Sequence, residues 1–166
     1  MDTNIILAAW DAHCWPAISN YYELETVEKC VEETLTHNPN DPRHIKMPAG
    51  DLYSGIRQRH NVTKLDIANL ILNGHCGATL DDDEQQLLAW LYCHEVLPSN
   101  VIRIATADKA AIMVANQLGW LDAVTSLEEL ATQAGVAKTN LNQLKSQYSK
   151  SWLTSARTQI RLGVLK

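Results

Sequence analysis

The chain has 166 residues, of which 46% are apolar and 20% are charged, and it carries a formal net charge of −5 at pH 7. This length allows one well-buried domain and excludes two of ordinary size, and the composition is that of a soluble globular protein. Because no apolar run approaches the ~20 residues of a membrane helix and the N-terminus lacks the pattern of a secretory signal, we expect a cytoplasmic protein that spans no membrane.

The first half of the chain predicts mainly short elements. At the N-terminus, either Asp2 ends a very short first strand, or residues 5–10 form the strand and Asp11 is the acid at its end. The next elements are, in order, a short helix over 16–22, a short strand over 24–27, a helix over 28–35, and helices over 51–58 and 63–72. The proline-rich segment 37–48 predicts a loop that is basic enough to contact a phosphate backbone.

The second half predicts alternating strands and helices. The elements are, in order, a helix that begins at the acidic run 81–84, a strand over 101–105, a helix that ends at Gly119, a strand over 123–125, and a helix from Ser126 to Gly135. A strand that leads directly into a helix builds parallel sheets, so we expect an α/β fold. Ligands of such sheets bind outside the carboxyl ends of the strands, which places Asp108 at an active-site edge.

Residues 136–166 differ from the rest of the chain in charge. They contain six Lys or Arg residues and no acid, so they carry +6 and the rest of the chain carries −11. Leu141, Leu144, Tyr148 and Trp152 are spaced as on one face of a helix. The segment predicts either a polyanion-binding extension beside a metal-binding pocket, or a solvated helix docked on an acidic body.

Several kinds of site are disfavoured by the spacing of reactive residues. The six histidines show no metal-ligand spacing, and the four cysteines contain no CxxC pair, so we expect buried free thiols. The sequence also lacks DxDxT, GxSxG and GxxxxGK[ST], which leaves phosphatase, nucleophilic hydrolase and P-loop mechanisms without support.

Acidic residues stand at the boundaries of four predicted elements: Asp2 or Asp11, Glu32 or Glu33, one of Asp81, Asp82, Asp83 and Glu84, and Asp108. Carboxylates crowded in one pocket repel each other, and burying them is costly unless a cation neutralises them. Mg²⁺ and Mn²⁺ prefer oxygen ligands, lower the pKa of a bound water and stabilise charge on a phosphoryl oxygen. The pattern therefore predicts phosphodiester hydrolysis.

Four stretches together resemble the PIN domain family: DTN before an apolar run, TVEKCVEET in an early helix, DDDEQQLLAW at the start of a middle helix, and TADKAAIMVANQLG followed by SLEEL. The resemblance covers about residues 1–134. It implies a three-layer α/β domain over residues 1–135, in which helices flank a central parallel sheet. Residues 136–166 lie outside the family pattern and form the basic, helical C-terminal extension.

The resemblance also implies the site, residue by residue. Asp2, Glu33, Glu84 and Asp108 are the catalytic and metal-binding acids, with Asp83 as a further metal ligand; Asn4, Thr106 and Lys109 are the supporting residues. Glu32 is the alternative to Glu33. The family places a full apolar strand before DTN, whereas here only Met1 precedes Asp2, so Asp11 remains the alternative to Asp2.

Many members of the family are ribonucleases, and some are the toxins of bacterial toxin–antitoxin pairs. We therefore expect an Mg²⁺- or Mn²⁺-dependent endoribonuclease with RNA as substrate, and an antitoxin protein or a second copy of the chain as partners. The alternative hypothesis is a catalytically inactive PIN-like module that binds RNA or protein.

Overall fold

The computed structural model describes residues 1–36, 45–99 and 101–164, and this part of the chain is mostly helical. It contains two parallel sheets of two strands each, in which β1 (Glu25–Val27) pairs with β2 (Gln58–His60) and β3 (Ile104–Ala105) with β4 (Val124–Thr125). The helices are α1 (Thr3–Asp11), α2 (Trp15–Tyr21), α3 (Glu28–Thr36), α4 (Ala49–Gly55), α5 (Lys64–Leu72), α6 (Asp82–Cys93), α7 (Lys109–Gln117), α8 (Leu127–Gln133), α9 (Lys138–Leu141) and α10 (Lys150–Arg161), with 3-10 turns η1 (Leu121–Ala123) and η2 (Ser146–Tyr148).

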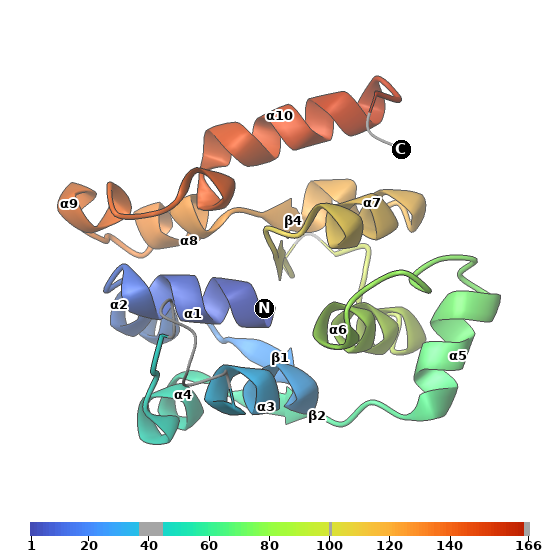
Figure 1. Ribbon diagram of the computed structural model, residues 1–166, viewed down its shortest axis with the longest axis horizontal. Coiled ribbons are helices and arrows are strands. Elements are labelled where there is room, and N and C mark those ends of the chain that lie inside the picture. Colours follow the sequence, from blue (N-terminus) through green and yellow to red (C-terminus); the bar gives the residue numbers. More distant parts are fainter. Residues whose placement is uncertain (37–44, 100, 165–166) are drawn as a thin grey trace.

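The first two residues lie between the two sheets (Figure 1). The backbone nitrogen of Met1 donates to the Glu25 carbonyl at 3.0 Å, and the Met1 carbonyl accepts from the Thr26 hydroxyl at 2.6 Å. On the other side, the Asp2 N–H donates to the Ala105 carbonyl at 3.2 Å. The predicted α/β class with parallel strand pairs is confirmed. A single central sheet of a three-layer PIN-like fold is not confirmed, because each sheet contains only two strands.

Asp2 caps a helix, so both alternatives for an N-terminal strand are wrong: residues 1–2 are not assigned to a strand, and residues 5–10 belong to α1. The Oδ1 atom of Asp2 accepts the Ile5 N–H at 2.8 Å and caps α1, which continues to Asp11. Residues 5–9 are all buried, because the helix is covered on most sides. An apolar run of this length is compatible with a buried strand or a buried helix, and packing determines which one forms.

Three further boundaries differ from the predicted ones. Only residues 104 and 105 of the predicted strand 101–105 pair with β4, and Val101 is 86% exposed. The predicted helix 51–58 ends at Gly55, because the Arg57 N–H bonds to the Leu24 carbonyl and the chain pairs with β1. The predicted helical face 141–152 is divided, since Ser149 caps a new helix by accepting the Trp152 N–H at 3.1 Å. Residues 37–44 of the predicted loop lie outside the described residues.

Two of the helices that the sequence predicts, over 63–72 and from Ser126, begin with side-chain caps. Thr63 caps α5 together with Asp66, and Ser126 caps α8 together with Glu129, each pair forming a reciprocal capping box. These short-range bonds fix where the helices begin, whatever the helices later pack against.

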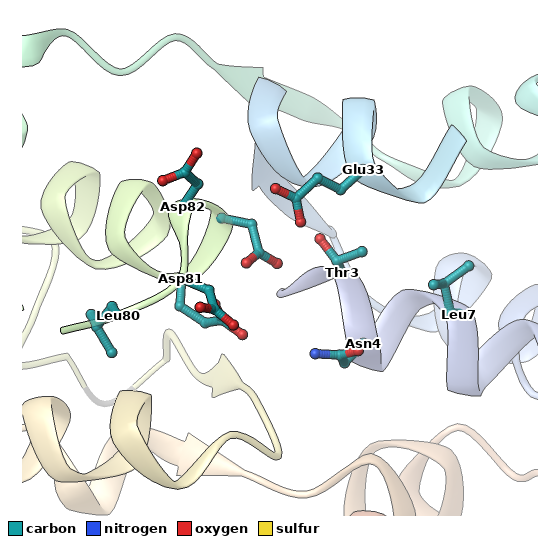
Figure 2. A pocket seen from close by; sticks show the side chains of 9 residues that line it. Thr3, Asn4, Leu7, Glu33, Leu80, Asp81 and Asp82 are labelled. Atoms are coloured by element: carbon teal, nitrogen blue, oxygen red, sulfur yellow. The ribbon is translucent and has the colours of Figure 1, made fainter. Parts of the chain in front are cut away.

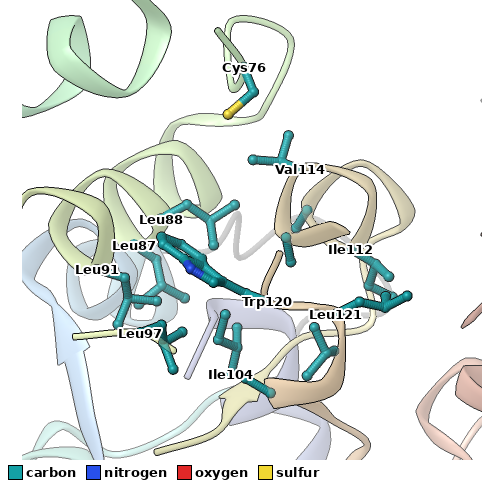
Figure 3. Packing of buried hydrophobic residues seen from close by; sticks show 14 of the residues in the cluster. Cys76, Leu87, Leu88, Leu91, Leu97, Ile104, Ile112, Val114, Trp120 and Leu121 are labelled. Atoms are coloured by element: carbon teal, nitrogen blue, oxygen red, sulfur yellow. The ribbon is translucent and has the colours of Figure 1, made fainter. Parts of the chain in front are cut away.

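The C-terminal extension packs onto the same core as the preceding residues. Trp120 is 5% exposed and lies beside the leucines of α6, including Leu88, in the same buried cluster as Ile112 of α7 (Figure 3). Leu153 and Ile160 of α10 belong to this buried cluster, and α10 packs against α7 and α8 (Figure 1). The extension therefore contributes to the stability of the whole chain.

Replacing Leu153 with Ala tests this contribution. Leu153 is 1% exposed, so we expect the free energy of unfolding of Leu153→Ala to fall by about 2–5 kcal/mol in chemical denaturation, since a buried leucine leaves a cavity. Gln159→Ala, on the exposed side of the same helix, is the control and should change stability by less than about 0.5 kcal/mol. Equal, small effects of the two substitutions would show that α10 does not share the core.

Candidate functional site

A cavity of about 430 Å³ lies between α1, α3 and the start of α6 (Figure 2). Its lining is strongly acidic and consists of Thr3, Asn4, Leu7, Glu33, Leu80, Asp81, Asp82, Asp83 and Glu84. The fold thus brings the acids of the early helix and those of the middle helix, which are far apart in the sequence, to one place. It places the N-terminal DTN segment beside them, because Met1 and Asp2 are held between the two sheets.

Asp2 is fully buried next to this cavity. Burial raises the pKa of Asp2 to about 6, although the Thr106 hydroxyl and the Ile5 N–H act to lower it, and the charge of Asp83 adds to the increase. The Oδ1 atom of Asp2 is used in capping α1, whereas Oδ2 has no hydrogen-bond partner among the described residues. One oxygen of the carboxyl therefore caps α1, and the other is buried without a partner in the described part of the chain; Asp2 itself is not among the residues that line the cavity.

Asp83 and Glu84 are also buried, being 3% and 4% exposed. The pKa of Glu84 is raised to about 9, chiefly by burial and additionally by a hydrogen bond to the Asp83 carboxyl and by the charges of Asp83 and Asp2. Glu84 is consequently protonated at neutral pH. Its Oε2 atom has no partner within the described part of the chain.

Buried oxygen atoms without a partner are uncommon in folded proteins and indicate a place for water or an ion. Here three of them, Asp2 Oδ2, Thr3 Oγ1 and Glu84 Oε2, come from the two segments that meet at the acidic cavity. All are hard oxygen donors of the type that Mg²⁺ and Mn²⁺ bind. However, over residues 1–36, 45–99 and 101–164, no group of three or more His, Cys, Asp or Glu side chains lies close enough to hold a metal ion. Metal binding through several carboxylates therefore requires side-chain rotation.

The structure distinguishes Glu33 from Glu32. Glu33 points from α3 into the cavity (Figure 2), and burial followed by the charge of Asp83 raises its pKa, against the opposing charge of Lys29. The Glu32 side chain is 62% exposed and interacts with Lys29 at 3.5 Å outside the lining. Glu33 is thus the acid of this helix that lies at the cavity.

The structure does not bring Asp108 into the lining of the cavity. Its Oδ1 atom accepts the Ala111 N–H at 2.9 Å and caps α7, and its own N–H donates to the Thr106 hydroxyl at 3.1 Å. Thr106 is buried and acts on the pKa of Asp2, so it links this turn to the site. Lys109 is exposed and likewise outside the lining.

The structure gives Thr3 and Asp11 different places relative to the acidic cavity. Thr3 lines the cavity and has a buried hydroxyl, although it was expected only as part of the DTN motif. Asp11, the alternative to Asp2, is exposed at the other end of α1 and lines a separate cavity. A helix in place of the expected strand is what moves Asp11 away from the acidic cavity.

Several cations of the extension contact the body of the protein. Arg161 pairs with Asp122 at 2.6 Å, Lys150 with Glu129 at 3.5 Å, and the Arg157 guanidinium donates to the Val124 carbonyl. For α10, these contacts favour the interpretation of a basic helix docked on an acidic surface.

Comparisons of the chain with family models, curated proteins and solved structures found no match. In the described part of the chain, no helix combines the length and the apolar character needed to cross a membrane. The function is therefore inferred from the site itself.

The raised pKa of Glu84 predicts a pH-dependent stability. Between pH 4.5, the ordinary pKa, and about 9, the folded state binds more protons at Glu84 than the unfolded state, so the free energy of unfolding should fall as the pH rises. Glu84→Gln imitates the protonated form. We expect it to be more stable than the unmodified protein at pH 8, by on the order of 1–3 kcal/mol, and similar to it at pH 4.5.

Denaturant unfolding at both pH values measures this effect. Glu32→Gln is the matched control, because the same change of charge on the exposed side of α3 should leave the pH dependence intact. A Glu84→Gln variant with the same pH dependence as the unmodified protein would show that Glu84 is ionised in the folded state at neutral pH.

Proposed function

We propose that this chain is a PIN-like, Mg²⁺- or Mn²⁺-dependent ribonuclease of the cytoplasm that hydrolyses RNA phosphodiesters at the acidic cavity. One observation carries the proposal: Asp2 and Glu84 are buried carboxyls from distant parts of the chain, and each has an oxygen with no hydrogen-bond partner among the described residues. Raised pKa values at Asp2 and Glu84 support it, because perturbed titration concentrates at functional sites.

Asp2, Asp83 and Glu84 are the first metal ligands in this proposal, with Glu33 completing the set from the opposite side of the cavity. A bound Mg²⁺ or Mn²⁺ supplies a water of lowered pKa and stabilises negative charge on the phosphoryl oxygen. Glu84 must lose its proton to bind a cation, so metal binding should strengthen as the pH rises from 6 to 8. Glu33 is partly exposed and can rotate toward the other acids without disturbing the core.

The remaining predicted residues have supporting roles in this proposal. Thr106 lowers the pKa of the Asp2 carboxyl, and Asp108 donates its backbone N–H to the Thr106 hydroxyl. Asn4 is exposed at the cavity and can donate its side-chain amide to a phosphate or sugar oxygen. Lys109 is an exposed cation that can contact the RNA backbone farther from the site. In this hypothesis the two sheets, joined by Met1 and Asp2, correspond to the central layer of the three-layer PIN-like fold. An antitoxin protein or a second copy of the chain would regulate the site.

One observation favours the alternative hypothesis of a catalytically inactive PIN-like module that binds RNA or protein. Throughout the described ranges, no group of three or more potential ligands stands at metal-binding distance. Such a module would bind RNA without Mg²⁺ and with a steep dependence on salt. The two hypotheses therefore differ in whether a divalent ion binds at Asp2 and Glu84.

Calorimetric titration of Mn²⁺ at pH 7.5 separates them. We expect binding by the unmodified protein, and at least a tenfold loss of affinity in Asp2→Asn and Glu84→Gln. Asn is as good a helix N-cap as Asp, so Asp2→Asn keeps α1 intact while removing the charge. Glu33→Gln should weaken binding, and its neighbour Glu32→Gln is the matched control.

The same variants are then tested for cleavage of a panel of single-stranded RNAs with Mg²⁺ or Mn²⁺. We expect Asp2→Asn and Glu84→Gln to lower the rate about 100-fold or more, since each removes a ligand of the cation. Mn²⁺ affinity that is unchanged in both variants, or no RNA cleavage by the Mn²⁺-bound protein, would exclude the ribonuclease hypothesis and leave the binding module. Asp108→Asn should affect cleavage less than Asp2→Asn, because Asp108 caps α7 outside the cavity.

A further inference from the structure

A second cavity, of about 230 Å³, continues from the acidic one along α1. The two cavities share Asn4 and Leu7, and the second one extends to Asp11 at the end of the helix. Residues 4, 7 and 11 are three and four positions apart, so they lie on one face of α1. With a rise of 1.5 Å per residue, this face is about 10 Å long between Asn4 and Asp11. One side of α1 is thus the common wall of a groove that begins at the acids.

The opposite wall of the second cavity comes from the C-terminal extension. Gln143, Lys145, Gln147 and Tyr148, around η2, line it. Tyr148 is 8% exposed, and its pKa is raised by burial and also by the charges of Asp2 and Asp11. Tyr148 and the residues of α1 therefore line the same cavity.

The lining has the chemistry of a site for one nucleotide. The side-chain amides of Gln143 and Gln147 each offer donors and an acceptor, as the edges of a nucleobase require. Asp11 accepts from amino groups, which C, A and G carry on their exposed edges. The apolar part of the lining consists of Leu7, Ala8, Ile45 and Leu144.

Lys145 supplies the charge that a phosphate needs. It is exposed and pairs with no acid among the described residues. In this it differs from Lys150, Arg157 and Arg161 of the same extension, which contact the body of the protein. The cavity is smaller than the ~300–1,000 Å³ of pockets that enclose a whole drug-sized ligand. It therefore suits one part of a longer ligand whose remainder lies in the acidic cavity.

We propose that the groove between α1 and residues 143–148 binds the nucleotide adjacent to the scissile phosphate of a single-stranded RNA, with Gln143 and Gln147 at the base and Lys145 at the phosphate. This inference rests on the proposed ribonuclease function, since it names the substrate that extends from the acidic cavity. It assigns a specificity-determining role to a segment outside the part of the chain that resembles the PIN family.

Binding of fluorescent single-stranded oligoribonucleotides in EDTA tests the groove separately from catalysis. Lys145→Ala should weaken binding of every sequence and reduce the slope of log K against log salt concentration by about 0.7, the value for one phosphate contact to a single strand. Lys138→Ala, an exposed lysine of the same extension outside both cavities, is the control and should change neither quantity. An equal effect of the two substitutions would contradict the proposal, because it would indicate that RNA responds to the overall positive charge of the extension and not to Lys145 in the groove.

The double variant Gln143→Ala/Gln147→Ala tests reading of the base. On oligonucleotides that differ at one position, we expect the unmodified protein to prefer one base by about tenfold and the variant to lose this preference without a change in the salt slope. Gln159→Ala on α10 is the matched control. A preference that persists in the double variant, or the absence of any preference in the unmodified protein, would overturn this assignment.

Cleavage assays distinguish failure of this inference from failure of the proposed function. If the protein cleaves RNA and Lys145→Ala and the double variant behave as unmodified protein in KM and in base preference, the ribonuclease proposal stands and the groove proposal is wrong. If EDTA-resistant binding depends on Lys145 but no RNA is cut, the groove binds RNA and the catalytic proposal is wrong. If single-stranded RNA does not bind in EDTA at all, the groove proposal fails whatever the result for Mn²⁺.

Discussion

The position of Met1 and Asp2 between the two sheets is the constraint on which the rest of the structure depends. The backbone of this dipeptide bonds to β1 on one side and to β3 on the other, and the Asp2 side chain starts α1. The second oxygen of the same carboxyl is buried and has no hydrogen-bond partner among the described residues. Sheet, helix and site are thus connected through one residue, so a displacement of Asp2 would change all three together.

Burying carboxyl groups beside the acidic cavity has an electrostatic cost. Burying Asp2, Asp83 and Glu84 close together raises the pKa values of Asp2 and Glu84 and keeps a proton on Glu84 at neutral pH. An apolar residue in the place of Glu84 would pack without this cost. A cation removes the same cost by replacing the proton, because its positive charge compensates several carboxylates at once. In the proposed ribonuclease, these unfavourable electrostatics of the unliganded site would favour binding of a divalent ion.

Local sequence signals predicted the parts of the fold that local bonds determine. The capping boxes at Thr63 and Ser126 define helix starts through contacts three residues apart. By contrast, residues 5–9 are apolar at every position, and this pattern fits a buried strand as well as a buried helix. The strand β2 consists of Gln, Arg and His and carries no apolar alternation, so only its pairing with β1 identifies it. The position of the acids likewise depends on long-range packing. The sequence singled out Glu33 and Glu84, but only the packing of α1, α3 and α6 brings them to one cavity.

The cations of the basic extension have two different structural roles. Those on α10 contact Asp122, Glu129 and the Val124 carbonyl, which are contacts of a docked helix. Lys145 instead stands beside α1, in a segment that η2 and the cap at Ser149 separate from α10. Docking of α10 through its buried apolar residues fixes the place of that segment relative to the acidic cavity. The packing of the last helix therefore determines which side chains face the groove along α1.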